Sequence, residues 1–446
     1  MATGKNDYVT LAAGGDVCTG HEPPESAFTH VLGALREADI RFAQAERLYT
    51  TRGRYQFQSL AEKMEIRKDP ATASAFKSVP FDVLSIASNH IGDFGPEAAE
   101  DTWQAFQDIG IPTIGGGRNI AEARAPVIIE KYGLRIAFLG YCSVLLPQYW
   151  ATEDRAGCAP MRASTFYEPY EFQPGSPARI VTVPHEEDLR LLLDDVRKAK
   201  QSADVVVLSM HWGLHYIPKP HDYQTIVAHA AIDAGVSVIL GHHPHQQQAI
   251  EVHKGAVIFY SLGNFAMYRR KGGHAYCMPN GEYTHGEVYN VEPDPGHLYD
   301  YKRHGDESGI AYLELDRNGV RRATYLPVLL NKLGQPEIVR PADAQFEATR
   351  EYLGWAARGL PGGVTELAVK DGRYVLYERK PAYRAQVRLG RRQENNEVAR
   401  LLLELHAGDS ARPFDEHVVV VRAMAFVEAG DSADGLAADV DAVAFG

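Results

Sequence analysis

Residues 236–245 read VSVILGHHPH, and this stretch decides the fold class because an apolar, β-branched run ends in a cluster of histidines. A short apolar run of this kind is typical of a strand buried inside a sheet. Residues 205–213, VVVLSMHWG, repeat the arrangement, with His211 and Trp212 directly after the apolar run. Polar groups that follow buried strands lie at the edge of an α/β sheet where ligands bind. The two stretches therefore predict strands whose ends build a site.

Three further motifs of the same kind precede these two along the chain. They are Gly15-Asp16-Val17-Cys18, the stretch FAQAE that ends in Glu46, and the stretch SNHIGD that carries Asn89, His90 and Asp93. Carboxylate, amide oxygen and imidazole together suit a divalent cation that keeps open positions for water or substrate. Five such motifs in order predict a metal-dependent enzyme.

The rest of the chain alternates apolar runs with amphipathic helical patterns, which predicts an α/β fold. The expected strands are residues 8–13, 83–87, 111–114, 125–131, 134–141, 205–210, 236–240, 249–253 and 256–261, and the expected helices are residues 28–38, 96–108, 185–200 and 223–234. Residues 47–80, 143–180 and 266–309 are rich in Tyr, Pro, Gly and charge and read as loops, the kind of segment that carries specificity. The last is either a substrate-facing insertion or a surface loop, and it holds His274, His285, His297 and His304.

The C-terminal part predicts a smaller extension. Residues 310–315 and 319–330 read as a hairpin turned at Arg317-Asn318-Gly319, followed by a helix over 346–358 and strands over 364–378. We therefore expect a main domain over residues 1–330 and an α+β extension over 331–446 that packs on it. The acidic, small-residue end from about residue 429 predicts a frayed tail.

Charge and composition limit the partners. The formal net charge of -12 argues against nucleic acid or an anionic membrane as the main partner. No apolar window is long enough to span a bilayer, and the first residues show no signal sequence, which predicts a soluble, cytoplasmic protein without a membrane partner. The four cysteines form no CxxC pair and suit a reducing compartment. The sequence leaves the oligomeric state open.

The five motifs, together with Ser261-Leu262-Gly263-Asn264-Phe265, resemble the CapA-like family of poly-γ-glutamate capsule synthesis. That family is a branch of the calcineurin-like metallophosphatases, so the resemblance implies a four-layer αββα sandwich with loop insertions. It also implies that His90 and Asp93 handle protons beside the metal. The metal positions that it implies are Asp16, Glu46, Asn89, His211, His243 and His245.

Two departures from the superfamily pattern bear on the metal. Cys18 stands where the first motif of the superfamily has histidine, so one bound ion is expected rather than two. With fewer imidazoles the site becomes richer in oxygen ligands, which favours Ca²⁺ or Mn²⁺ and leaves Zn²⁺ or Fe as alternatives. Capsule proteins also commonly carry an N-terminal membrane anchor, and none is expected here.

The anchor-free version of the family also resembles the peptide epimerases of lasso-peptide biosynthesis. This likeness implies inversion of the Cα of a C-terminal residue, a tryptophan, in a ribosomal precursor peptide. Two-base chemistry would need His90 with Asp93 and a second pair, either His243 or His245 with Asp16. The alternative is a metallohydrolase of a phosphoester or a γ-glutamyl amide, which the same site would serve. A degenerate, non-catalytic binding module is a third reading.

Several neighbouring residues have open roles. Glu46 could instead be an exposed glutamate beside Arg47, and His242 is expected to be the histidine of its cluster that does not bind metal. Trp212, His242 and Asn264 are candidate substrate-binding residues, although Trp212 could pack beneath the site. The remaining nearby histidines, His215, His221 and His229, are expected to be solvated.

Overall fold

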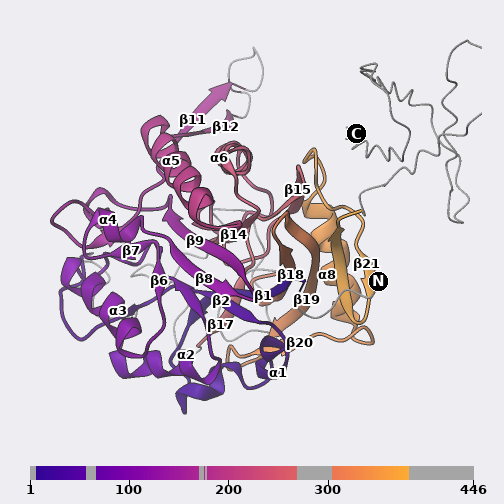
Figure 1. The fold of residues 1–446 in the computed structure, drawn as a ribbon, viewed down its shortest axis with the longest axis horizontal. Coiled ribbons are helices and arrows are strands. Elements are labelled where there is room, and N and C mark those ends of the chain that lie inside the picture. Colours follow the sequence, from indigo (N-terminus) through magenta and orange to yellow (C-terminus); the bar gives the residue numbers. More distant parts are fainter. Residues whose placement is uncertain (1–6, 57–66, 170–174, 176–177, 269–303, 381–446) are drawn as a thin grey trace, which may run out of the picture. The chain divides into compact units, whose positions relative to one another are not determined.

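A computed structural model describes residues 7–56, 67–169, 175, 178–268 and 304–380. The larger of the two main sheets in these residues is centred on strand β1 (Val9–Cys18) (Figure 1). β1 runs parallel to β2 and β17 and antiparallel to β18. The strand order is β21-β22-β19-β18-β1-β2-β5-β6, with β17 paired to β1 and β20 paired to β19. Its other strands are β2 (Ile40–Ala45), β5 (Val83–Ser85), β6 (Thr113–Ile114), β17 (Asn264–Met267), β18 (Glu307–Asp316), β19 (Gly319–Leu330), β20 (Pro336–Ile338), β21 (Ala368–Lys370) and β22 (Arg373–Glu378).

The second sheet has six strands in the order β15-β16-β14-β13-β9-β8. Its central strands β9, β13, β14 and β16 are parallel, as expected for a sheet covered on both faces. The strands are β8 (Val127–Lys131), β9 (Leu134–Cys142), β13 (Val205–His211), β14 (Val238–His242), β15 (Ile250–His253) and β16 (Ala256–Phe259).

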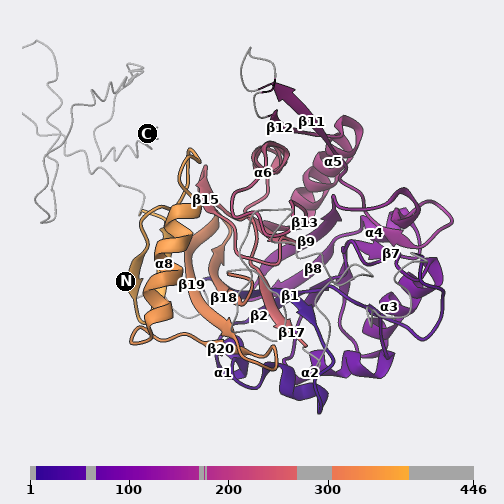
Figure 2. The ribbon, with the colours of Figure 1, turned by 180° about the vertical axis from the view of Figure 1, so that it is seen from behind.

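Three apolar cores separate four layers. The core between the two sheets joins side chains of both, for example Phe42 of β2 stacked on Phe138 of β9 with ring centroids 6.3 Å apart. A second core packs α5 and α6 on the six-stranded sheet, and a third packs α1, α2 and α3 on the larger sheet (Figures 1 and 2). The expected αββα sandwich is confirmed. The helices are α1 (Leu32–Arg36), α2 (Ala75–Ser78), α3 (Pro96–Asp108), α4 (Ile120–Ala123), α5 (Glu186–Ser202), α6 (Asp222–Ala234) and α8 (Ala344–Ala356), with short 3₁₀ turns η1 (Pro24–Phe28), η2 (Pro70–Ser74) and η3 (Pro147–Tyr149).

Four of the five predicted helices lie within two residues of their predicted bounds. Helix α3 begins at Pro96, whose fixed φ and missing N–H suit the first helical position. Helix α6 begins after His221, which forms a capping box with Gln224, so His221 has a structural role and is not simply solvated. The helix expected over 28–38 is split into η1 and the short α1.

Segments read as loops hold more structure than expected. Residues 143–180 contain β10 (Gly157–Cys158), paired with β7 (Gly116–Gly117), and β11 (Ala163–Pro169), paired with β12 (Ala178–Pro184). Residues 47–80 contain β3 (Leu48–Tyr49) and β4 (Arg67–Lys68) besides α2 and η2. β11 is exposed at every residue after Ala163, so its sequence lacks the alternation that marks a half-buried strand.

The two ends of the predicted insertion and the first part of the extension, up to residue 380, are described. His304 is described, whereas His274, His285 and His297 and the tail from residue 429 lie outside the described residues. Strand β22 pairs with β19, so residues up to 378 continue the larger sheet. The division of the chain at residue 330 stays a prediction. Among the described residues, the helices are all too short or too polar to cross a bilayer.

A bulge in β1 turns Asp16 toward the second sheet. The pairing of β1 with β2 shifts register between Ala13 and Asp16, at Gly14-Gly15. Bulges of this kind re-aim side chains near active sites. A Cβ at Gly15 would lie 2.0 Å from the carbonyl oxygen of Gly263, so only glycine permits the close approach of β1 and the turn before β17.

Candidate metal centre

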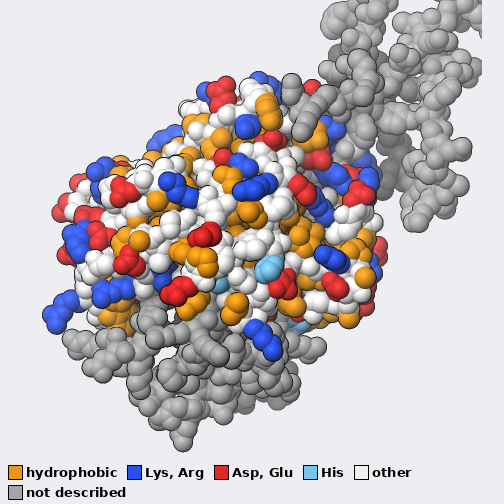
Figure 3. All heavy atoms as spheres, turned by 90° about the horizontal axis from the view of Figure 1, so that it is seen from below, with side chains coloured by type: hydrophobic (Ala, Val, Ile, Leu, Met, Phe, Trp, Pro, Cys, Tyr) orange, Lys and Arg blue, Asp and Glu red, His pale blue; other side chains and the backbone are white. Residues whose placement is uncertain are grey.

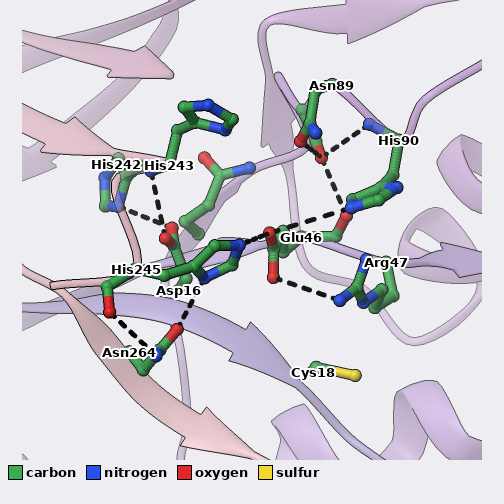
Figure 4. Close-up of polar contacts among 12 residues, drawn as sticks. Asp16, Cys18, Glu46, Arg47, Asn89, His90, His242, His243, His245 and Asn264 are labelled. Carbon is green, nitrogen blue, oxygen red and sulfur yellow. Dashed lines mark hydrogen bonds and ion pairs between the residues drawn. The ribbon is translucent and has the colours of Figure 1, made fainter. Parts of the chain in front are cut away.

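The ends of strands from both sheets meet at one site (Figure 4). Asp16 lies at the end of β1, Glu46 directly follows β2 and Asn89 follows β5, all in the larger sheet. The six-stranded sheet contributes His211 at the end of β13, and the loop after β14 contributes His243 and His245. The structure therefore brings the residues predicted from five separate motifs into one network.

The tightest group is formed by Asp16, Glu46 and His245. Their ligand atoms all lie within 4.8 Å of one another, and all three residues are buried. His245 Nε2 lies 3.1 Å from Glu46 Oε1, but neither oxygen of Glu46 nor Oδ1 of Asp16 has a partner in hydrogen-bond geometry. Buried carboxylate oxygens without partners are costly, and a shared cation would satisfy them. The donor set therefore fits a divalent ion, with Asp16, Glu46 and His245 to hold it.

Asn264 fixes the orientation of His245. Its amide Nδ2 donates to the carbonyl oxygens of His245 and Gly305, at 3.2 and 2.8 Å, so its Oδ1 faces the His245 ring. Because that oxygen only accepts, the Nδ1–H of His245 donates to it at 2.8 Å, and the lone pair of Nε2 is left for the site. This is the kind of outer contact that sets the tautomer of a metal-binding histidine.

Asn89, His211 and His243 form a second group beside the first. His211 Nε2 lies 3.0 Å from Asn89 Oδ1, and the rings of His211 and His243 have centroids 5.0 Å apart. Burial, reinforced by neighbouring histidines, holds the pKa of both rings well below the usual range. Both rings are therefore neutral at neutral pH, the state that binds metal.

The loop that carries the histidines after β14 has a strained backbone. His243 and His245 have φ values of +96° and +56°, in the region that non-glycine residues rarely adopt. Its backbone is fixed from the other sheet, because His243 N donates to Asp16 Oδ2 at 3.0 Å. Strain maintained by the surrounding structure clusters at functional sites, where it positions side chains.

His90 and Asp93 form the predicted dyad at the edge of the metal group. The Nδ1–H of His90 donates to Asp93 Oδ2 at 2.6 Å, and Tyr149 donates to the other oxygen of Asp93 at 3.2 Å. The free nitrogen, Nε2, lies 4.0 Å from Glu46 Oε1. An imidazole held in this way can give or take a proton beside the metal group. Tyr149 belongs to none of the motifs, so its contact with Asp93 could not be predicted from the sequence.

Glu46 is a buried residue at a strand end, which rules out the exposed position considered from the sequence. Its side chain has no exposed surface, and Arg47 Nη2 lies 4.0 Å from its Oε2. Burial alone would raise the pKa of this carboxyl, but the charges of His245, Arg47 and His90 hold it well below its usual range. Glu46 in turn overcomes the effect of burial on His245 and raises the pKa of that ring to about 9, so a cation that binds Nε2 would replace a proton there.

Cys18 takes no part in the metal group. Its side chain packs with Met267 and Leu330 in a small apolar cluster, and Figure 4 shows its sulfur turned away from Asp16 and Glu46. The departure from the superfamily motif therefore removes one ligand and puts no thiolate in its place.

The three predicted substrate-binding residues lie inside the protein, and their contact with a substrate stays a prediction. Trp212 is fully buried and donates from Nε1 to the carbonyl oxygen of Tyr260. His242 is also fully buried, with Nδ1 3.2 Å from Asp16 Oδ1, and Asn264 is occupied with His245 as described. His242 and Asn264 contact residues of the metal group, whereas Trp212 packs in the core between the six-stranded sheet and its helices.

Two histidines expected to be solvated are instead partly buried. The ring of His215 packs against His243 and His245, with centroids 4.2 and 5.1 Å away, so it lines the site. His229, on helix α6, lies 2.9 Å from Glu251 of strand β15. Neither contact could be predicted from the sequence, because each depends on how distant segments pack together.

The four-layer sandwich and the ligand set at its strand ends define a protein of the calcineurin-like metallophosphatase type. Residues 10–269, more than half of the chain, match the family described as bacterial capsule synthesis protein PGA_cap. The chain belongs to this family, and the CapA-like resemblance found in the sequence is confirmed.

Curated relatives carry related names. The chain is 29% identical to the capsule biosynthesis protein CapA of Bacillus anthracis over 58% of its length, and 28% identical to the PGA biosynthesis protein CapA of Bacillus subtilis over 59%. The matches span 60% and 65% of those two proteins. The structure of a purple acid phosphatase from yellow lupin seeds aligns with 72% of this chain and with 51% of the phosphatase chain. The two are 10% identical in sequence, and the TM-score is 0.31. None of these findings supports the likeness to lasso-peptide epimerases.

Proposed function

We propose that the protein is a metal-dependent hydrolase that cleaves a γ-glutamyl amide or a phosphoester. The observation that carries this proposal is the pairing of an ion-ready group, Asp16, Glu46 and His245, with a separate proton-handling dyad, His90 and Asp93. The names of the CapA relatives favour the amide of a glutamyl polymer over the phosphoester. The comparisons support this alternative better than the epimerase hypothesis.

The roles of the chain's own residues follow from their contacts. A divalent ion bound by Asp16, Glu46 and His245 would activate water and polarise the bond to be cleaved. His90 is placed to protonate the leaving group through Nε2, and Asp93 stabilises the imidazolium that precedes this transfer. Tyr149 holds Asp93 in place from its other oxygen.

The face of the molecule in Figure 3 gives little long-range guidance to a charged substrate. Figure 3 shows acidic and basic side chains interspersed over the described part of one face, in spite of the net charge of -12. Such a mixed surface provides no broad field of one sign to steer a polyanion. An anionic substrate would therefore be recognised at the site itself, where Arg47 lies beside Glu46.

Single-residue variants test the hydrolase. His90→Asn should lower the turnover of a γ-glutamyl anilide or an aryl phosphate by about 10²- to 10⁴-fold and leave the metal content unchanged. His185→Asn is the matched control, because His185 forms the same i,i+3 pair with Asp188 at 3.3 Å on another part of the chain. Wild-type turnover by the His90 variant would refute the dyad, and no cleavage of either substrate by the metal-loaded wild type would refute the hydrolase.

An epimerase is the second candidate, and one observation favours it. His90 and His245 approach the same oxygen of Glu46, at 4.0 and 3.1 Å, so two imidazoles flank one carboxylate (Figure 4). Inversion of a Cα needs an acid and a base on opposite faces of the carbon. Incubation with a precursor peptide in D₂O separates the candidates, because epimerisation places deuterium at one Cα without shortening the peptide.

A further inference from the structure

A second cluster of metal-binding side chains lies outside the site described above, between helix α6 and strand β15. It consists of His229 on α6 and of Glu251 and His253 on β15, and the ligand atoms of the three residues lie within 4.8 Å of one another. Because side chains alternate along a strand, Glu251 and His253 point to the same face of β15, toward His229. The two elements lie beside one another in Figures 1 and 2.

One separation within this cluster matches a coordination shell, that between His229 and Glu251. His229 Nε2 lies 2.9 Å from Glu251 Oε1. Neighbouring ligands at about 2.1 Å from one ion stand about 3 Å apart when the angle at the ion is near 90°. The rings of His229 and His253 stack with centroids 3.9 Å apart and planes 8° from parallel, so one ring has to turn out of the stack for both to bind the same ion.

The surroundings hold the cluster in place and keep it accessible. Glu251 is fully buried, and Tyr260 donates to its other oxygen at 2.7 Å, the type of contact that orients a metal-binding carboxylate. The side chain of His229 is 29% exposed, so an ion can enter from solvent. The neighbouring cation, Lys254, is paired with Asp233.

We propose that His229, Glu251 and His253 bind a divalent transition-metal ion of the Zn²⁺ class. Two imidazoles with one carboxylate are a ligand set that suits Zn²⁺, Ni²⁺ and Cu²⁺ better than Ca²⁺ or Mg²⁺. Strand β15 is the edge strand of its sheet, and the ion ties this edge to helix α6. The site is structural and separate from the candidate metal centre.

The variant His253→Phe tests the proposal. Phenylalanine keeps a flat ring stacked on His229 and leaves the contact between His229 and Glu251, but removes the ligand nitrogens. Tag-free protein is dialysed against Zn²⁺ and its metal is counted by elemental analysis. We expect His253→Phe to retain one equivalent of Zn²⁺ fewer than wild type, with unchanged stability in the absence of Zn²⁺.

A control and a second measurement make the result decisive. His30, which lies 3.7 Å from Glu337 elsewhere on the surface, gives the matched variant His30→Phe, which should bind as much Zn²⁺ as wild type. Zn²⁺ should also slow amide hydrogen exchange in β15 and α6 of wild type and not of His253→Phe. Equal Zn²⁺ in wild type and His253→Phe, equal losses in both variants, or unchanged exchange would overturn the proposal. Hydrolase activity does not enter these readouts, so they stand apart from the function proposed above.

Discussion

Asn264 decides which nitrogen of His245 faces the metal group, and this role is testable at a single residue. Asn264→Ala removes the acceptor of the His245 Nδ1–H, so the ring loses its fixed tautomer and orientation. We expect metal affinity to fall about 10- to 100-fold, measured by competition with a chromogenic chelator. Ser308→Ala is the control, since it removes a buried hydrogen bond to Leu262 without touching His245. Equal affinities in the two variants would show that Asn264 is merely structural.

Among single residues, the site residues that belong to sequence motifs were predicted, and those outside motifs were missed. Asp16, Asn89, His90 and His211 each follow an apolar run, and the fold brings such strand ends together. Tyr149 reaches Asp93 from η3, and His215 reaches His243 from a loop. Those contacts depend on tertiary packing between segments far apart in the chain. Trp212 and Asn264 are buried with partners inside the protein, a surrounding that the sequence does not reveal.

The bulged strand β1 supports a prediction about a whole element. Gly15→Ala would place a Cβ 2.0 Å from the carbonyl oxygen of Gly263 and would force β1 away from the turn before β17. Overpacking of this kind costs about 1–3 kcal/mol in the free energy of unfolding, measured by urea denaturation. Gly33→Ala in helix α1 is the matched control, because nothing lies within 4 Å of its added Cβ. The control should be neutral or slightly stabilising, and an equal cost in both variants would contradict the argument.

Buried elements were the predictable ones. Strands β13 and β14 and helix α3 lie within a residue or two of their predicted bounds, because their apolar patterns are long and clear. Strand β2 was not among the expected strands, although its C-terminal motif was recognised. The largely exposed β11 and the start of its partner β12 were read as loop because tertiary pairing, and not burial, makes them strands.

The candidate metal centre joins the two sheets, so metal removal should affect the whole molecule. Asp16, Glu46 and Asn89 come from the larger sheet, and His211, His243 and His245 come from the other. When the free concentration of the ion is 100 times its dissociation constant, binding stabilises the folded state by about 2.7 kcal/mol. Treatment with EDTA should therefore lower Tm, and readdition of a divalent ion should restore it. An unchanged Tm in protein shown to have lost its metal would argue against an ion that bridges the sheets.

Acid should weaken the fold through His21, which joins two distant parts of the chain. Its Nε2–H donates to the carbonyl oxygen of Leu333 at 3.0 Å, and its Nδ1 is buried without a partner. Burial lowers the pKa of His21 from 6.5 to about 4, so protons bind the unfolded chain more tightly. This contribution to stability is complete above pH 6.5 and is lost as the pH falls toward 4, at a cost on the order of 3 kcal/mol. Urea denaturation at pH 7.5 and 5 should show a smaller loss for His21→Gln than for wild type, and equal losses would exclude His21 as a source.

The left-handed backbone of His243 and His245 has a consequence for protein engineering. Each of these conformations costs about 1–3 kcal/mol in a residue other than glycine. Glycine or asparagine at either position would relieve that cost, so a selection for thermostability alone would enrich such replacements and erase the histidines. A library evolved from this chain for heat resistance should therefore be screened for bound metal in every round, because its most heat-resistant members would include inactive ones.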